Sequence, residues 1–250
     1  MARDKAYREA EKKIEEARLS GATELDLSTK YSAKDDEKLT EIPDSLWKLT
    51  QLQELNLSSN QLTALPESLG QLTQLQSLDL SNNQLTVLPE SIGELNKLKS
   101  LDLDDNQLTV LPESLGNLTQ LFQIWISSPL DSFPKCIREW KRLELLWLPE
   151  CKIDSIPDWL VELTNLSYIR LERNNLADLP TSLAQLEHLT NLNITENPLN
   201  PEFAKAYLRA KAEAQITLNE AKLISQCLLI NMGKSYARCL IILIHSDTRL

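Results

Sequence analysis

The sequence predicts an α/β solenoid, built from a unit that recurs along most of its 250 residues. Three observations support this fold class. Leucines recur in Leu-x-Leu pairs, an Asn follows most of these pairs, and an apolar residue with a Pro follows later in each unit. The prolines count the coils in steps of 23, 23, 23, 22, 23 and 23 residues: Pro43, Pro66, Pro89, Pro112, Pro134, Pro157 and Pro180. One such unit cannot cover its own leucines, so neighbouring units must stack into a continuous core.

Each Leu-x-Leu pair predicts a short strand, because alternate side chains of a strand fall on one face. In one coil, Leu55 and Leu57 point inward while Asn56 points outward. The same pattern gives eight strands, at 25–27, 55–57, 78–80, 101–103, 124–126, 146–148, 169–171 and 192–194. They should form one parallel sheet on the concave side of a horseshoe, with return segments that begin at the prolines. This period and pattern are those of a leucine-rich repeat.

The Asn that follows a strand has a predicted structural role. Its side-chain amide can donate to and accept from backbone groups of its own and neighbouring coils. A buried asparagine ladder is therefore expected from Asn60, Asn83, Asn106, Asn174 and Asn197. Pro129 and Cys151 occupy the ladder position in two successive coils, so the ladder should be interrupted there.

The pattern divides the chain into four segments. Residues 1–20 carry Ile14 and several alanines at helical spacing and predict an N-terminal capping helix. The repeats occupy 21–200, in about eight coils, and Pro201 opens a predicted C-terminal capping helix over 201–222. Residues 223–250 form an atypical apolar tail, in which neither apolar run reaches the ~18 residues of a membrane span. This tail can add a strand, pack on the cap or stay poorly placed.

The first coil contains an insertion. Leu39 follows Leu27 by twelve residues, whereas Leu62 follows Leu57 by five. The seven extra residues lie within 28–38 and should project as a polar loop. Loops on a rigid scaffold often carry function, but insertions are also tolerated at low entropic cost, and both interpretations stay open.

Composition and charge exclude several classes of partner. A net charge of −10 disfavours binding to nucleic acid or to anionic membranes, which needs clustered Lys and Arg. The N-terminus has no apolar core of signal-peptide length, and the four cysteines, Cys136, Cys151, Cys227 and Cys239, make no dense disulfide framework. We therefore expect a cytoplasmic protein. His188 and His245 have no partner at a catalytic or metal-binding spacing, so no metal, cofactor or enzymatic activity is expected.

The flanks of the repeats resemble those of the leucine-rich-repeat region of bacterial Roco proteins, in which such repeats precede a Ras-like GTPase domain. The entry, from Ile14 to Leu27, and the exit, Asn197-Pro-Leu-Asn-Pro201 with Asn219-Glu-Ala-Lys-Leu223, carry the resemblance, which covers about residues 10–223. The repeats are also similar to those of plant intracellular Ras-group leucine-rich-repeat proteins. The resemblance implies the regulatory half of a GTPase signalling protein, truncated before its catalytic half.

A nucleotide site is not expected. Gly233-Lys234-Ser235 matches the end of a phosphate-binding loop, but that motif requires glycine where this chain has Leu228. The 15 residues after Ser235 are too few for the remaining strands and loops of a GTPase. We interpret Gly-Lys-Ser as a chance match.

Function is therefore sought on the outward side of the predicted sheet. The outward residue between the two inward residues of each strand reads Asp26, Asn56, Asp79, Asp102, Trp125, Trp147, Arg170 and Asn193. We predict a protein-binding surface across the middle strands, with an acidic part beside an aromatic and basic part. Its residues are Asp79, Asp102, Asp104, Asp105, Phe122, Trp125, Trp147, Tyr168, Arg170 and Arg173. The alternative for the acids is a solvated face that keeps the protein soluble. For Trp125, the alternative is that the loop after Pro129 covers it.

Overall fold

The computed structural model describes residues 5–30, 32–202, 205–206, 208–209 and 241–243. Its backbone contacts divide the chain into two compact units, which are described separately. Unit 1 comprises Met1–Pro129 and Pro134–Trp140, and unit 2 comprises Leu130–Phe133 and Lys141–Leu250.

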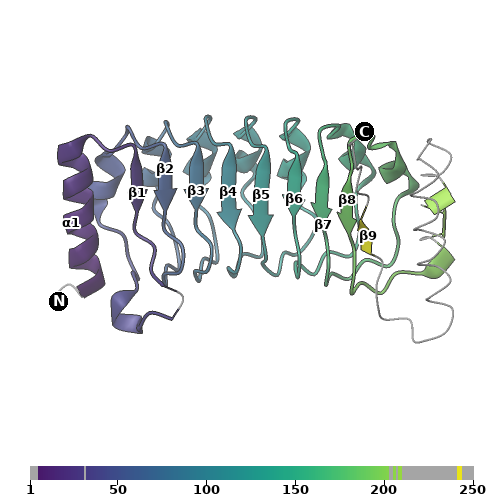
Figure 1. The fold of residues 1–250 in the computed structure, drawn as a ribbon, viewed down its shortest axis with the longest axis horizontal. Coiled ribbons are helices and arrows are strands. Elements are labelled where there is room, and N and C mark those ends of the chain that lie inside the picture. Colours follow the sequence, from purple (N-terminus) through teal and green to yellow (C-terminus); the bar gives the residue numbers. More distant parts are fainter. Residues whose placement is uncertain (1–4, 31, 203–204, 207, 210–240, 244–250) are drawn as a thin grey trace, which may run out of the picture. The chain divides into compact units, whose positions relative to one another are not determined.

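Unit 1 opens with helix α1, Lys5–Ser20, beside the first of five strands that pair in parallel (Figure 1). The helix buries Ala6, Tyr7, Ala10, Ile14 and Ala17, so its apolar stripe covers the end of the leucine core. The strands are β1 (Glu24–Asp26), β2 (Glu54–Asn56), β3 (Ser77–Asp79), β4 (Ser100–Leu103) and β5 (Gln123–Ile126). Their inward residues stay in register from Leu55 through Leu78 and Leu101 to Ile124.

Unit 2 repeats this arrangement with three parallel strands and one antiparallel strand. The parallel strands are β6 (Leu145–Trp147), β7 (Tyr168–Arg170) and β8 (Asn191–Asn193). Strand β9, Ile241–Leu243, pairs antiparallel with β8. The eight parallel strands were predicted, but all eight were predicted to begin one residue later, and six of them also to end one residue later. In those six strands the first residue of the return turn was counted as strand. In several of these coils the preceding Asp or Asn side chain accepts a hydrogen bond from the backbone N–H two residues later, which bends the backbone there.

The return segments are short 3-10 helices that begin directly after the coil prolines. In one coil, the N–H of Leu69 donates to the carbonyl of Pro66 at 3.0 Å. Proline suits this place because it has no N–H to leave unpaired. The helices that follow these prolines are Asp44–Lys48, Glu67–Gln71, Glu90–Glu94, Glu113–Asn117 and Lys135–Glu139 in unit 1, and Asp158–Glu162 and Thr181–Gln185 in unit 2.

Glycine allows adjacent return segments to approach closely. A Cβ atom on Gly93 would lie 2.5 Å from the backbone oxygen of Ser114, and one on Gly70 would lie 2.9 Å from the backbone oxygen of Ser91. Both distances are too short for a side chain. The repeat therefore uses Gly here because coil stacking leaves no room for another residue.

The predicted insertion in the first coil is anchored by polar contacts. It contains a 3-10 helix, Asp35–Glu37. Gln61 donates to Asp35 Oδ1 at 2.7 Å, and Lys5 of α1 donates to Glu37 Oε1 at 3.3 Å. Both contacts tie the loop to its own unit.

The C-terminal predictions fall mostly outside the described residues. Residues 201–202, 205–206 and 208–209 are helical, where the second capping helix was expected, and Leu208 is buried. The rest of 201–222 and most of the tail lie outside the described residues, including Cys227, Gly233-Lys234-Ser235, Cys239 and His245. In the part of the chain that the structure describes, no helix is long and apolar enough to cross a membrane.

Candidate protein-binding surface

The side of each sheet that faces away from the leucine core carries one column of outward residues, here called the outer column. In unit 1 the outer column is Asp26, Asn56, Asp79, Asp102 and Trp125. In unit 2 it is Trp147, Arg170 and Asn193. The predicted surface crosses both units, so its members are described within the unit that contains them. Whether Trp125 and Trp147 share a surface stays a prediction.

All five Asp and Asn residues of the outer column close a turn. Asp79 Oδ1 accepts hydrogen bonds from the N–H of Ser81 at 2.9 Å and from its hydroxyl at 2.7 Å. Asp102 accepts from the N–H of Asp104 at 2.9 Å. Asp26, Asn56 and Asn193 make the same contact two residues onward. These side chains therefore end the strands, a role typical of Asp and Asn. This role was not predicted, although the spacing Asp/Asn-x-Ser/Thr/Asp in the sequence indicates it.

The acidic residues of unit 1 also crowd one another. Asp79 and Asp102 lie opposite each other on the paired strands β3 and β4. Burial is the main cause that raises the pKa of Asp102 to about 6. The hydrogen bond from the N–H of Asp104 opposes this rise, and the charges of Asp79, Asp104 and Asp105 add to it. Asp105 lies in a left-handed turn with φ 49°. The cluster thus holds a carboxyl group that titrates near neutral pH.

Trp125 interrupts the outer column at the end of unit 1. It pairs with Asp102 on the neighbouring strand and is half-buried, as is Phe122 just before β5. An indole cannot accept the hydrogen bond that closes the turn in the neighbouring coils. Trp125 therefore cannot close a turn in its own coil in the way that Asp102 does one coil earlier.

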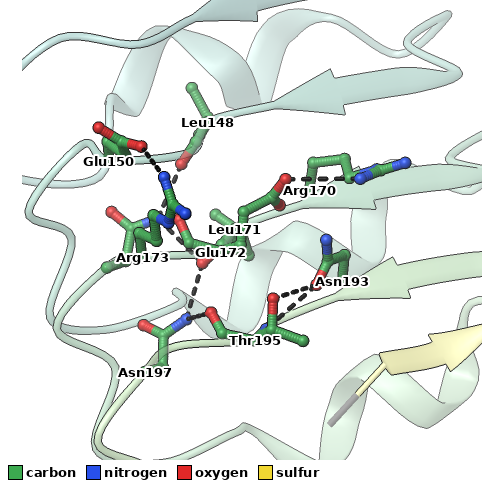
Figure 2. Close-up of polar contacts among 10 residues, drawn as sticks. Leu148, Glu150, Arg170, Leu171, Glu172, Arg173, Asn193, Thr195 and Asn197 are labelled. Atoms are coloured by element: carbon green, nitrogen blue, oxygen red, sulfur yellow. Dashed lines mark hydrogen bonds and ion pairs between the residues drawn. The ribbon is translucent and has the colours of Figure 1, made fainter. Parts of the chain in front are cut away.

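In unit 2, Trp147 on β6 and Arg170 on β7 occupy neighbouring positions of the outer column. The guanidinium carbon of Arg170 lies 4.8 Å from the centroid of the Trp147 ring, within the range of a cation–π contact. One guanidinium nitrogen of Arg170 contacts Glu172 Oε1 at 3.5 Å (Figure 2). The Nε1 atom of Trp147 is buried and has no hydrogen-bond partner among the described residues. The pair is partly exposed, since the Arg170 side chain retains 35% of its accessibility.

Two further residues extend this pair along the strands. Tyr168 is 46% exposed, one of the few large apolar side chains at the surface, and it lies opposite the half-buried Leu145. Both point to the same side as Trp147 and Arg170, because residues two apart in a strand share a face. We call the group Leu145, Trp147, Tyr168 and Arg170 the aromatic surface of unit 2.

Arg173 was predicted beside Arg170 but has a different setting. It occupies a left-handed turn, with φ 55°, and it donates to Glu150 at 2.8 Å and to Glu196 at 3.1 Å. Figure 2 shows the contact with Glu150 and the turn in which Arg173 lies. The same turn position is occupied in three successive coils by Glu150, Arg173 and Glu196. The 23-residue spacing of alternating charges in the sequence could have revealed this column.

The asparagines of the predicted ladder hydrogen-bond to the backbone of two coils. Asn83 Nδ2 donates to the carbonyls of Leu57 and Leu80, each at 3.0 Å, while its Oδ1 accepts from the N–H of Leu62 at 3.1 Å. Asn60, Asn106, Asn174 and Asn197 make equivalent contacts. The residue before each of these asparagines has positive φ: Ser59, Asn82, Asp105, Arg173 and Glu196.

The described thiols and the described histidine show no catalytic arrangement. Burial raises the pKa of Cys136 to about 12, so its thiolate is scarce at neutral pH. Cys151 is buried, and its thiol donates to the carbonyl of Pro149 at 3.3 Å. His188 is exposed. Within the described ranges, no group of three or more His, Cys, Asp or Glu residues could hold a metal ion.

Comparison with protein families gives a clear result for the repeats. Residues 25–146 match the family model described as a leucine-rich repeat region. The fold is that of a leucine-rich repeat. A comparison with curated proteins found no match.

Several solved structures are similar to this chain. Internalin C2 from Listeria monocytogenes is 22% identical with a TM-score of 0.65, over 79% of this chain and 86% of internalin C2. The plant peptide hormone receptor RGFR1, in complex with RGF2, is 32% identical with a TM-score of 0.63, over 74% of this chain. The ectodomain of GASSHO1/SCHENGEN3 from Arabidopsis thaliana, in complex with CASPARIAN STRIP INTEGRITY FACTOR 2, is 31% identical with a TM-score of 0.57, over 64% of this chain. This chain spans 30% and 20% of the lengths of these two plant receptors.

Proposed function

We propose that this protein is a binding module that holds a protein or peptide partner on the exposed face of its sheets, with the aromatic surface of unit 2 as the main contact. The observation that carries the proposal is the Arg170–Trp147 pair. It occupies the outer column, where Asn193 in the next coil closes a turn. Neither Trp nor Arg can close that turn, so the requirements of the fold do not account for them.

The composition of this surface supports the proposal. Trp, Tyr and Arg are the residues that most often dominate the energy of protein interfaces. Each is partly exposed here, and Tyr168 is nearly half exposed. Large apolar side chains that lie together at a surface are typical of interaction sites.

The solved relatives support the same class of function. The structure of RGFR1 contains RGF2, and that of the GASSHO1/SCHENGEN3 ectodomain contains CASPARIAN STRIP INTEGRITY FACTOR 2. We extend the role of holding another molecule to this chain by analogy. A cytoplasmic location and a link to a Roco-type GTPase stay hypotheses from the sequence, because neither the family match nor these structures bear on them.

The residues of unit 1 enter the proposal as a second contact. They are Asp79, Asp102, Asp104, Asp105, Phe122 and Trp125. Trp125 provides the support here, because it replaces a turn-closing residue as Trp147 does in unit 2. Asp79 and Asp102 already close turns, and that role alone explains why an Asp or Asn stands at these positions. A partner would recognise their negative charge, which the turns do not require.

The test is quantitative capture of partners from a lysate of the source organism on immobilised full-length protein. The variant Trp147→Ala with Tyr168→Ala should lose the captured proteins, and Trp125→Ala should weaken their capture. His188→Ala is the matched control, since it truncates an exposed side chain outside the sheet. Thermal unfolding of each variant should remain close to that of the wild type. Equal capture by the wild type and the double variant would exclude the aromatic surface as the binding site.

A further inference from the structure

Most N–H donors of the Arg170 guanidinium make no hydrogen bond to the described residues, and they indicate the chemistry of the partner. Resting on the function proposed above, we infer that the aromatic surface of unit 2 binds an extended acidic peptide segment. In this segment a carboxylate engages Arg170, and an apolar side chain two residues away packs on Trp147 and Tyr168.

The guanidinium of Arg170 can accept a carboxylate. A guanidinium carries five N–H donors in one plane, in a geometry that matches a carboxylate. Its only hydrogen-bonding partner within the described ranges is Glu172 Oε1, at 3.5 Å, which is the long limit of such a contact. Figure 2 shows that the guanidinium extends beyond the nitrogen that contacts Glu172. The contact with Trp147 holds the group at the surface.

The acidic residues that follow β6, β7 and β8 each contact an arginine. Arg173 holds Glu150 and Glu196 at 2.8 and 3.1 Å. The Glu172 side chain retains only 17% of its accessibility, and its Oε2 atom is buried. A basic partner would meet the positive charge of Arg170 itself, whereas an acidic side chain would complement it. The net charge of −10 opposes a long acidic run, but charges beyond ~8 Å are largely screened at physiological salt. One or two local carboxylates are therefore the chemistry that fits.

The register of the strands sets the spacing of the partner's side chains. Tyr168 and Arg170 are two residues apart on β7, so they are separated by about 6.6 Å along the strand. An extended segment that runs along β7 has the same spacing between its residues i and i+2. The recognised pattern is therefore an Asp or Glu two positions from a Leu, Ile, Val, Phe, Tyr or Trp, in either chain direction.

A random dodecapeptide display library panned on immobilised full-length protein tests this inference. The wild type should enrich the acidic-x-apolar or apolar-x-acidic pattern. Arg170→Gln should keep the apolar preference and lose the acidic excess, and Trp147→Ala should lose the enrichment. Tyr168→Ala, which truncates an exposed side chain, provides a second variant if Trp147→Ala unfolds. An enriched peptide and its Asp→Asn or Glu→Gln version then give dissociation constants by fluorescence polarisation.

The two failures are distinguishable. We expect the neutral peptide to bind the wild type about tenfold more weakly than the acidic one, and the two peptides to bind Arg170→Gln equally. Peptides that depend on Trp147 but show no acidic excess, or show a basic one, would overturn the inference and leave the proposed function intact. An equal loss on neutralising the peptide in wild type and Arg170→Gln would also overturn it. A library without any enrichment dependent on Trp147 or Tyr168 would overturn both.

Discussion

Asp102 on β4 lies directly opposite Asp79 on β3, and both side chains face away from the leucine core. Burial, together with the nearby charges of Asp79, Asp104 and Asp105, raises the pKa of Asp102 to about 6. An acid whose pKa is raised by folding is destabilising in its ionised form. The penalty is absent below the unfolded pKa of about 4, grows as the pH rises from there to about 6, and is constant above it.

The first prediction follows for Asp102→Asn. The amide keeps an oxygen to accept the N–H of Asp104 and removes the charge. The variant should be more stable than the wild type by about 1 kcal/mol at pH 7.5 and equal to it at pH 4, after allowance for solvent exposure. Thermal or urea unfolding between these pH values measures the difference, with Asp26→Asn as the control at an exposed position of the outer column. A constant difference from pH 4 to 7.5 would contradict the assignment.

The second prediction concerns the asparagine ladder. Asn174 Oδ1 accepts from the N–H groups of Cys151 and Ile153, and its Nδ2 donates to the carbonyl of Leu148 at 2.7 Å. Asn174→Ala leaves these buried groups unpaired and should lower the free energy of unfolding by about 2–4 kcal/mol. Urea unfolding is the measurement. The neighbouring Asn175→Ala, which removes one exposed contact of 3.3 Å, should cost less than about 0.5 kcal/mol.

The third prediction compares two glycines. A methyl group on Gly93 would lie 2.5 Å from a backbone oxygen, whereas one on Gly116 would first meet Cγ of Glu139 at 3.3 Å, which is the movable part of a flexible side chain. Gly93→Ala should cost about 1–3 kcal/mol, and Gly116→Ala should be tolerated. Thermal unfolding of the two variants separates these outcomes. Equal melting temperatures would mean that the return segments can move apart.

The fourth prediction is that loss of the charge on Arg173 has little effect on the free energy of unfolding. The column Glu150–Arg173–Glu196 is more than half exposed, and exposed ion pairs contribute little. Arg173→Gln should therefore change the free energy of unfolding by less than about 0.5 kcal/mol at 0.15 M salt. Urea unfolding at low and high salt is the measurement. A loss above 1 kcal/mol that persists at high salt would show that the column stabilises the turn itself.

The strands, the return segments and the eight-coil repeat were predictable because each depends on residue types that recur at a fixed spacing. Leu55 and Leu57 indicate a strand in any one coil, and the seven prolines place the 3-10 helices. The seven-residue insertion could also be located by counting. A local pattern was sufficient for all of these features.

The surface was less predictable because it depends on contacts between coils. Asp79 and Asp102 were considered as part of a binding surface or as solvated charges, but their oxygens also close turns. Arg170 and Arg173 were grouped by proximity in the sequence, yet one contacts Trp147 and the other lies in a left-handed turn. The raised pKa of Asp102 results from burial and neighbouring charges, which a single coil does not contain.

Each ladder asparagine hydrogen-bonds to backbone groups of the coil that precedes it in the chain. Asn83 binds backbone groups of residues 57 and 62, and Asn174 binds those of residues 148 and 153, so a coil that precedes a ladder asparagine is completed by that asparagine. During synthesis, a coil that has left the ribosome still lacks these partners until about 21 to 26 further residues have emerged. Folding on the ribosome should therefore lag one coil behind translation, and a pause within a coil would expose the carbonyls of the coil before it.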